Sequence, residues 1–432
     1  MIDWTQIVAF LSFENSSVNV VVFGSMLLGA CSALIGTFSL LQKRALIGDT
    51  IAHSLLPGIC TAFLLYPVKN TWTLLIGAVI SGLFSIYVID YIRQKTKLKN
   101  DAIIALTLSV FFGIGLFLLG IIQQGDYANQ SGIDHFLFGK AAALMYDDLI
   151  VYGILALSTL AIIILFFRAF FTTTFDPHFA QSIGMPIKAI DFLLSTLTVI
   201  AVAIGIQTVG VVLMAAMLVT PAAGARYWTN NLRKLLIYAA ILGAISGFFG
   251  ALISYLAPNM PTGPWIVLSL SFFTITSILF APKRGVLYRW NKKRNWKSKL
   301  ESENVLKTFF LLGEKDHDFT KSRTAIDLIN RRHFNEITLK KTLRKLVNKE
   351  KLIQINGNYT LTARGKEEGQ RLSKIHRLWE MYLTTTLNIA PDHVHEDAES
   401  IEHIITPELE KRLEEILDFP ENDPHNRKIP YR

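Results

Sequence analysis

The chain has 432 residues, of which 51% are hydrophobic and 18% charged, and its formal net charge is +9. Its two cysteines, Cys31 and Cys60, lie inside apolar stretches, which excludes a disulfide framework. The net charge alone does not indicate a nucleic-acid partner, because much of it lies at the ends of apolar stretches and beyond residue 282. Up to Ala281, apolar stretches recur with close to the ~20 residues that cross a bilayer, and none follows Lys283.

Nine apolar segments are predicted to span the membrane, or eight if one of them is re-entrant. They lie near residues 19–41, 50–66, 71–92, 102–122, 149–170, 188–206, 209–225, 234–256 and 264–281. Asp3 and Glu14 precede the first long apolar run, where a signal peptide has basic residues, so we expect no cleaved signal peptide.

Lysine and arginine gather in every second loop between these segments. The basic loops carry Lys43, Arg44, Arg93, Lys95, Lys97, Lys99, Arg168, Arg226, Arg233, Lys234, Lys283, Arg284 and Arg289. The positive-inside rule therefore predicts a multi-pass protein with its N-terminus outside and its C-terminal part in the cytoplasm.

The segment GDTIAHSLLPG, residues 48–58, places Asp49 and His53 four residues apart on one face of a predicted helix. Ionisable side chains are costly in a membrane and tend to line transport paths. One carboxylate and one imidazole suit a borderline divalent metal such as Mn, Fe or Zn. The alternative is structural: Asp49 caps the second span, and His53 bonds a carbonyl of a neighbouring helix. Pro57 and Gly58 are expected to interrupt this span where backbone lines a cavity.

The segment FDPHFAQSIGMP, residues 175–186, lies between two spans on the predicted cytoplasmic side. It predicts a short helix parallel to the membrane, with Asp176 as N-cap, Pro177 in the first turn, and Gly184 with Pro186 as the stop signal. Alone this is a weak signal, because any connecting loop can contain one helical turn.

Together, GDTIAHSLLPG, FDPHFAQSIGMP and QTVGVVLMAAMLVTPAAGAR (residues 207–226) resemble the ABC-3 family of metal-uptake permeases over most of 18–282. The resemblance implies transport of manganese, zinc or iron across the bacterial inner membrane by a permease homodimer, with a cytoplasmic ABC ATPase and an extracytoplasmic metal-binding protein. It places Asp49 and His53 on the metal path and makes 175–186 the helix that couples to the ATPase. Its coupling residues would be Asp176, Pro177, Phe179 and Gly184.

ATP hydrolysis is expected on the separate ATPase subunit. The chain contains no G-x-x-x-x-G-K-[ST] phosphate-binding loop, so we expect a transport subunit and not an enzyme, with no organic cofactor. An intramembrane metal hydrolase that uses Asp49 and His53 is a weaker alternative, since it lacks a further ligand motif such as H-E-x-x-H.

The soluble part begins with 283–300, a linker with eight Lys or Arg and no acidic residue, which suits anionic lipid headgroups. Helices near 303–313, 321–331 and 337–350, followed by two short strands within 352–365, give the element order of a winged helix. Its third helix has the core candidates Ile337, Leu339, Leu343, Leu346 and Val347 and the DNA-contact candidates Lys340, Lys341, Arg344 and Lys345. The alternatives are a solvated charged face and a protein-binding surface.

The acidic end of the chain offers a second set of metal ligands. On one predicted helix Glu399, Glu402 and His403 share a face, and His376 alongside would complete a mixed N/O set suited to Mn or Fe. HRLWEMYL, AESIEH, ITPELEKRLEE and DPHNRKIP resemble the diphtheria-toxin-repressor and manganese-regulator family over nearly all of 301–432. In that family these four positions bind regulatory metal.

One departure from that family concerns the first helix of its winged helix, which supplies further ligands, usually Asp or Glu. Asn304 and Lys307 stand there in this sequence, and a lysine cannot coordinate a divalent cation at neutral pH. The site is then incomplete, weaker, or structural.

The fold class predicted is an all-α membrane domain of eight or nine spans, followed by a winged-helix domain and a helical metal-binding and dimerisation domain. The boundaries are 1–282, 283–300 for the linker, 301–375 and 376–432. We expect a divalent-metal permease with a metal-responsive cytoplasmic domain that gates transport or binds operator DNA. The alternative function is a membrane-anchored, metal-dependent transcriptional regulator.

Overall fold

The computed structural model describes residues 4–66, 71–124, 145–257, 260–387, 389 and 401–431. The chain forms two compact units, Met1–Tyr288 and Arg289–Arg432. Each is built around its own buried core, so we describe them separately.

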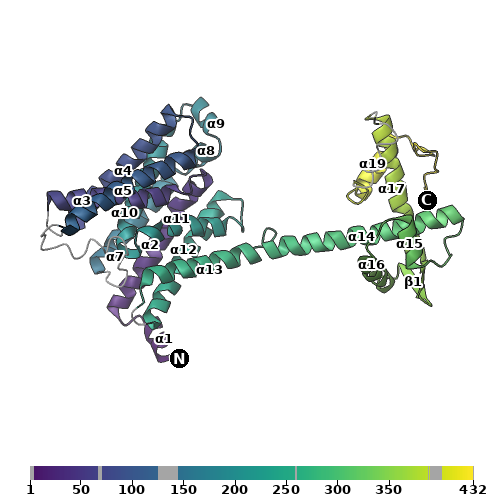
Figure 1. Cartoon of the computed structure of the whole chain (residues 1–432), viewed down its shortest axis with the longest axis horizontal. Coiled ribbons are helices and arrows are strands. Elements are labelled where there is room, and N and C mark those ends of the chain that lie inside the picture. The colour runs from purple at the N-terminus through teal and green to yellow at the C-terminus, as the bar shows by residue number, and fades with distance from the viewer. Residues whose placement is uncertain are drawn as a thin grey trace. The chain divides into compact units, whose positions relative to one another are not determined.

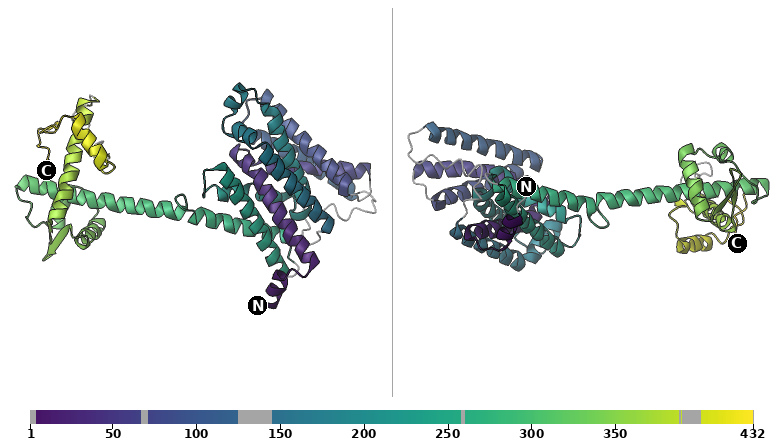
Figure 2. Two further views of the ribbon diagram at one scale, coloured as in Figure 1. Left: turned by 180° about the vertical axis from the view of Figure 1, so that it is seen from behind. Right: turned by 90° about the horizontal axis from the view of Figure 1, so that it is seen from below.

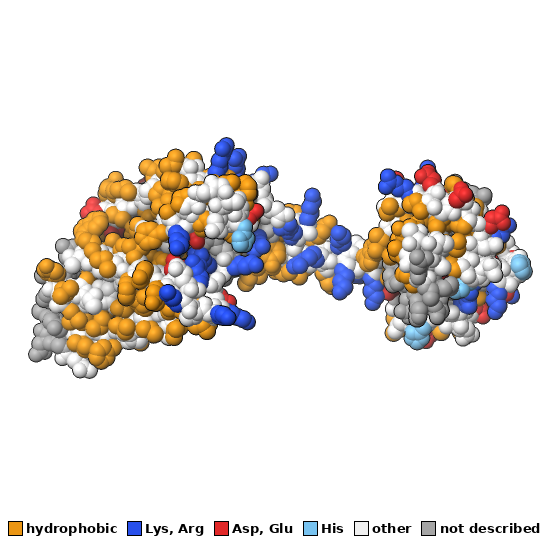
Figure 3. Space-filling view, turned by 90° about the horizontal axis from the view of Figure 1, so that it is seen from above, with side chains coloured by type: hydrophobic (Ala, Val, Ile, Leu, Met, Phe, Trp, Pro, Cys, Tyr) orange, Lys and Arg blue, Asp and Glu red, His pale blue; other side chains and the backbone are white. Residues whose placement is uncertain are grey.

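The first unit is a bundle of helices (Figures 1 and 2). In chain order these are α1 (Trp4–Leu11), α2 (Ser16–Leu41), α3 (Ile47–Leu65), α4 (Thr71–Lys95), α5 (Asn100–Gln124), α7 (Tyr146–Leu165), α8 (Phe167–Phe175), α9 (Pro177–Ser182), α10 (Ile187–Val209), α11 (Val211–Ala225), α12 (Leu232–Leu256) and α13 (Thr262–Phe280). Hydrophobic side chains cover much of the face of this unit seen in Figure 3. An apolar exterior of this kind is what contact with lipid requires.

Eight helices among the described residues are long and apolar enough to cross a membrane. The predicted span at 209–225 corresponds to α11, which has 15 residues and would cover roughly 22 Å, less than the ~30 Å hydrocarbon core. Gly210 separates it from α10 with a φ of 93°, a conformation that favours glycine. Eight of the nine predicted segments thus match helices that are long enough to span the membrane, and the ninth matches the shorter apolar helix α11.

Helix α3 is the most buried of these eight spans and forms the centre of the apolar core. The expected interruption at Pro57 and Gly58 is wrong, because the helix continues through both residues. Gly58 serves helix packing: a Cβ atom there would lie 2.1 Å from the carbonyl oxygen of Gly77 in α4. Small residues allow membrane helices to approach this closely.

We expect Gly58→Ala to separate α3 from α4, because the added methyl group meets a backbone oxygen that cannot move alone. Overpacking of this kind costs about 1–3 kcal/mol. The melting temperature of the detergent-purified protein should fall, while Gly113→Ala in α5, where an added Cβ atom meets nothing within 4 Å, should leave it unchanged. Equal melting temperatures for the two variants would contradict this account of the packing.

The second unit contains α14 (Val286–Asp316), α15 (Ala325–Arg331), α16 (Glu336–Asn348), β1 (Leu352–Ile355), β2 (Asn358–Leu361), α17 (Ala363–Thr385) and α19 (Pro407–Ile416). The first three residues of α14, 286–288, fall in the first unit. The strands pair antiparallel, with Ile355 opposite Asn358. Asn356 and Gly357 form the two-residue turn with φ angles of 50° and 83°, as a type I′ turn requires. The order of three helices and a hairpin is the predicted one.

Helix α16 packs its apolar face into the core of this part of the unit. The expected core residues Leu339, Leu343 and Leu346 are buried there. Ile337 is 81% exposed, so its prediction as a core residue is wrong. It lies in the first turn after the N-cap Asn335, where the apolar stripe has not yet reached the core.

Two of the predicted domain boundaries fall inside continuous helices. The basic segment 283–300 lies mostly within α14, which has 31 residues and also contains the helix expected near 303–313. The boundary at 375 falls inside α17. A smaller core of Leu378, Leu413 and Ile429 joins α17 to α19 and to the chain beyond it.

Candidate functional site

The Asp49 and His53 pair lies at the start of α3. His53 Nε2 is 3.4 Å from Asp49 Oδ1, as the helical spacing predicts. The His53 ring packs edge-on against Phe112, with its centroid 4.6 Å from that of the phenyl ring. The His53 side chain is 17% exposed and that of Asp49 37%, so the carboxylate remains accessible while the imidazole is held by packing.

The structural alternative for this pair does not match the local geometry. The N-cap of α3 is Leu46, which makes no side-chain capping bond, so Asp49 is not the cap. His53 Nδ1 is buried and has no hydrogen-bond partner among the described residues, so a bond to a helix carbonyl does not hold it. Buried polar atoms in proteins are almost always paired, so this nitrogen is left available for a bond to water or to an ion.

The loop that leads into α3 is tied to α10 by an ion pair that the sequence analysis missed. Arg44 lies 3.3 Å from Asp191 Oδ2, and Gln42 donates to the other oxygen of the same carboxylate over 3.4 Å. Both charged side chains are partly buried, at 18% and 23% exposed. The pair thus connects the turn before Asp49 with the helix that follows α9.

Helix α9 has the local structure expected for 175–186. The Asp176 carboxylate accepts a hydrogen bond of 2.9 Å from the backbone N–H of Phe179, and Pro177 occupies the first turn. Gly184 ends the segment with a φ of 76°. The Phe179 side chain is 53% exposed and Ala180 is buried, so the helix rests on the bundle by one face and presents an aromatic ring on the other.

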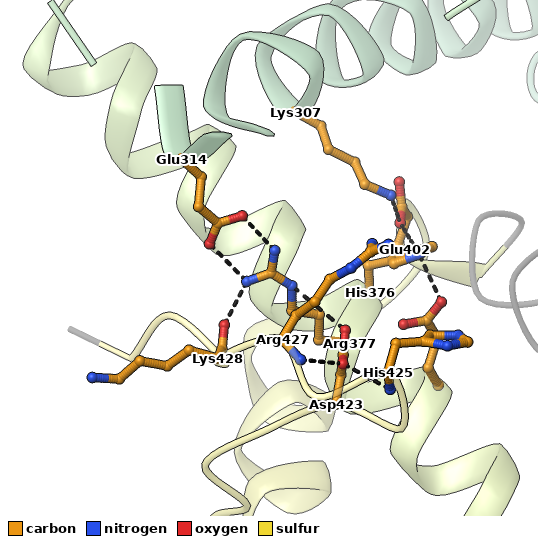
Figure 4. A network of polar contacts seen from close by, with 10 residues as sticks. Lys307, Glu314, His376, Arg377, Glu402, Asp423, His425, Arg427 and Lys428 are labelled. Carbon is orange, nitrogen blue, oxygen red and sulfur yellow. Dashed lines mark hydrogen bonds and ion pairs between the residues drawn. The ribbon is translucent and has the colours of Figure 1, made fainter. Parts of the chain in front are cut away.

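A second cluster of ionisable side chains lies in the C-terminal unit, between α14, α17 and the turn before α19 (Figure 4). Lys307 Nζ donates to Glu402 Oε2 over 2.6 Å, and His376 Nδ1 lies 2.6 Å from the same oxygen. His376 Nε2 is 3.2 Å from Glu380 Oε1. All four side chains are buried.

His403, the neighbour of Glu402, completes this cluster on the α14 side. Its Nδ1 lies 2.7 Å from Glu303 Oε2, and its Nε2 lies 3.1 Å from Asn304 Oδ1. In the described part of the chain, no three His, Cys, Asp or Glu side chains are grouped so that they could hold a metal ion. Glu399, the fourth predicted ligand, lies outside the described residues.

Charge complementarity shifts two pKa values in this cluster. Burial opposes protonation of His376, but its contacts with Glu380 and Glu402 outweigh burial and hold its pKa above the usual value. Burial likewise disfavours the Glu402 carboxylate, but His376 and Lys307 outweigh burial and lower its pKa. His376 and Glu402 thus stabilise the charged form of each other.

Arg377, the next residue along α17, joins three segments of the C-terminal unit (Figure 4). Its guanidinium donates to both carboxylate oxygens of Glu314 in α14, over 2.9 and 2.5 Å, and to the carbonyl oxygen of Lys428 over 2.5 Å. Asp423 lies 3.9 Å from its Nε. A planar guanidinium suits this bidentate geometry.

The four predicted DNA-contact residues on α16 differ in their surroundings. Lys341 and Arg344 are exposed to solvent. Lys340 is paired with Glu336 over 2.7 Å, and Lys345 donates to the Ser298 hydroxyl over 2.6 Å. Burial lowers the pKa of Lys345. An exposed basic surface on this helix therefore rests chiefly on Lys341 and Arg344.

Comparisons with known proteins bear on both units. Residues 15–281 match the model of the ABC 3 transport family, and residues 362–431 match that of the iron dependent repressor, metal binding and dimerisation domain. The manganese transport system membrane protein MntC of Bacillus subtilis is 37% identical over 424 residues, which cover 98% of this chain and 96% of that one. The zinc transport system membrane protein TroC of Treponema pallidum is 38% identical over 283 residues, 65% of this chain and 95% of TroC.

A solved structure agrees with the same assignment. A chain of PsaBC from Streptococcus pneumoniae, determined in complex with Fab, superposes with a TM-score of 0.58 at 29% identity, covering 67% of this chain and 99% of that one. The helical fold and the matched sequence define a multi-pass transport permease that carries a repressor-type domain at its C-terminal end. The chain belongs to the ABC 3 transport family, as its sequence motifs predict.

Proposed function

We propose that the chain is the membrane subunit of an importer for a divalent transition metal, with manganese as the first candidate. The observation that carries the proposal is the pair Asp49 and His53 on α3, with a buried imidazole nitrogen that has no hydrogen-bond partner among the described residues. A carboxylate oxygen and an imidazole nitrogen suit Mn, Fe and Zn alike. The MntC relative spans nearly the whole chain, including the C-terminal unit, and this favours manganese over zinc.

The test of the metal is uptake of radioactive Mn, Zn and Fe by cells that express this chain with its ATPase and its extracytoplasmic metal-binding protein. We expect accumulation of Mn at low external concentration, with weaker competition from the other two metals. Uptake of none of the three would overturn the proposal, and uptake of Zn alone would overturn the choice of manganese.

The partners follow from the family and from the arrangement of charge. We propose a permease homodimer in the bacterial inner membrane that works with a cytoplasmic ATPase and an extracytoplasmic binding protein. With α11 counted as a crossing, the positive-inside rule applied to the basic loops supports an N-terminus outside and a C-terminal unit in the cytoplasm. Helix α9 would then face the cytoplasm and couple to the ATPase through Phe179. Asp176, Pro177 and Gly184 would hold the ends of this helix in place.

We expect Phe179→Ala to weaken association with the ATPase about tenfold or more, because an exposed aromatic ring at the centre of an interface commonly contributes over 1 kcal/mol. The measurement is copurification of the ATPase with tagged permease, together with transport-coupled ATP hydrolysis. Phe272→Ala is the matched control, since Phe272 is 62% exposed on α13 in an apolar span. Equal ATPase recovery for both variants would remove α9 from the interface.

A second function, contact with operator DNA, is favoured by one observation. Lys341 and Arg344 are exposed on α16, the third helix before the β1–β2 hairpin, at the positions expected for phosphate contacts. Salt-dependent binding of a DNA fragment from upstream of the gene by full-length protein, lost in the Lys341→Ala, Arg344→Ala double variant, would support this function. Binding with no dependence on these residues would contradict it.

A further inference from the structure

The charged cluster of the C-terminal unit pairs α14 with the turn before α19 in a crossed pattern. Glu303 and Lys307 lie one helical turn apart on α14, and the consecutive residues Glu402 and His403 face them. The carboxylate of Glu303 meets the imidazole of His403, and the ammonium of Lys307 meets the carboxylate of Glu402. Glu303 and Lys307 thus each have a complementary partner within the protein.

The Lys307 ammonium lies against the carboxylate that a bound cation would use as a ligand. Its Nζ lies 2.6 Å from Glu402 Oε2, and the side chains of both residues are at most 5% exposed. A first-row metal on that carboxylate would bind at about 2.0–2.2 Å, in van der Waals contact with the ammonium. An ammonium offers three donors and no lone pair, so it repels such a metal and cannot coordinate it.

The imidazole that would be the next ligand is also engaged by carboxylates. His376 faces Glu402 with one ring nitrogen and Glu380 with the other. Among the described residues, the side chains of this cluster therefore do not fit the regulatory metal implied by the match of 362–431 to a metal-binding repressor domain.

We propose that the Lys307 ammonium is the resident cation of this cluster, so that α14, α17 and the turn at 401–404 are held together without a divalent metal. The C-terminal unit then keeps the repressor-like arrangement at any metal concentration and does not sense the transported ion. This inference does not depend on which metal the membrane unit carries, nor on whether it carries one.

The test uses full-length protein in detergent with Asp49→Ala and His53→Ala in every sample, so that the transport path contributes no binding. Protein is incubated with Mn²⁺, desalted and assayed for retained metal, and its melting is followed with and without Mn²⁺. With Lys307 present, we expect no retained Mn²⁺ and no metal-dependent shift in melting. Retention of about one Mn²⁺ per chain, lost on Glu402→Gln, would overturn the proposal.

Three variants at position 307 test the role of the ammonium. Lys307→Glu supplies a carboxylate beside Glu402 and His376, and we expect it to retain Mn²⁺ and to melt at a higher temperature when the metal is present. Lys307→Met should lower the melting temperature without any response to metal, and Lys307→Arg should preserve it by keeping the charge. A folded Lys307→Glu protein that retains no Mn²⁺ would show that Lys307 does not stand in a cation site. If Lys307→Glu does not fold, the result with Lys307 present still decides the question.

Discussion

Cells that express His53→Ala or Asp49→Ala should lose metal uptake by at least about 10-fold at matched membrane abundance, since even the loss of an outer-shell partner of a metal ligand commonly costs about 10- to 100-fold. The physical reason is that each substitution removes one of the two donor groups that face each other over 3.4 Å at the start of α3. Initial rates of radioactive Mn uptake, measured with the ATPase and the binding protein present, provide the measurement. Both variants should lose uptake of the same metal.

The matched control is Asp101→Ala, which removes an exposed acidic residue from the first turn of the neighbouring α5. It should transport at the rate of the unchanged protein. Unchanged uptake in the His53→Ala variant would make the unpaired imidazole nitrogen a packing feature. The membrane-anchored regulator would then become the leading function.

Arg377→Met should destabilise the C-terminal unit by about 3–5 kcal/mol, the usual consequence of removing one partner from a buried ion pair. Arg377 is 3% exposed and Asp423 is 4% exposed. Among the described residues, Arg377 is the cation nearest to the Asp423 carboxylate, so its loss leaves that buried carboxylate without a cation beside it. Glu314 and the carbonyl oxygen of Lys428 also lose their donor. Pulse proteolysis of the full-length protein in urea, followed on fragments from 289–432, measures the effect.

Arg364→Met on the same helix is the control for this prediction. Arg364 pairs with Glu350 over 3.3 Å, but both side chains are more than 70% exposed, at 76% and 79%. Exposed pairs of this kind contribute about 0–1 kcal/mol, so the urea midpoint should hardly move. A similar midpoint for the two variants would mean that Arg377 does not hold the three segments together.

The features that could be predicted from sequence are those that neighbouring residues determine. The N-cap at Asp176 and the stop at Gly184 are set by residues a few positions away, and the structure contains both. The apolar spacing of Leu339 and Leu343 placed one face of α16 in the core for the same reason. The Asn356 and Gly357 turn likewise follows from its two residue types.

Features that depend on distant segments could not be predicted. Pro57 signals a helix break, but α3 continues through it and packs Gly58 closely against α4, and no local pattern reveals this packing. Arg44 and Asp191 are 147 positions apart, and each alone is typical of the end of a membrane span. The sequence identified Lys307 as unsuitable for a metal site, but only the fold shows that its ammonium lies on Glu402, 95 positions away.

The position of Lys307 also has a consequence at the level of the gene. Lysine and glutamate codons differ only at their first base, so one transition from A to G replaces the ammonium by a carboxylate. At present the Lys307 ammonium balances the Glu402 carboxylate. A glutamate at position 307 would add a second carboxylate, so an external cation would be needed to balance the charge. Populations that carry this gene are therefore one point mutation from a version whose C-terminal unit responds to metal, and selection decides which of the two is kept.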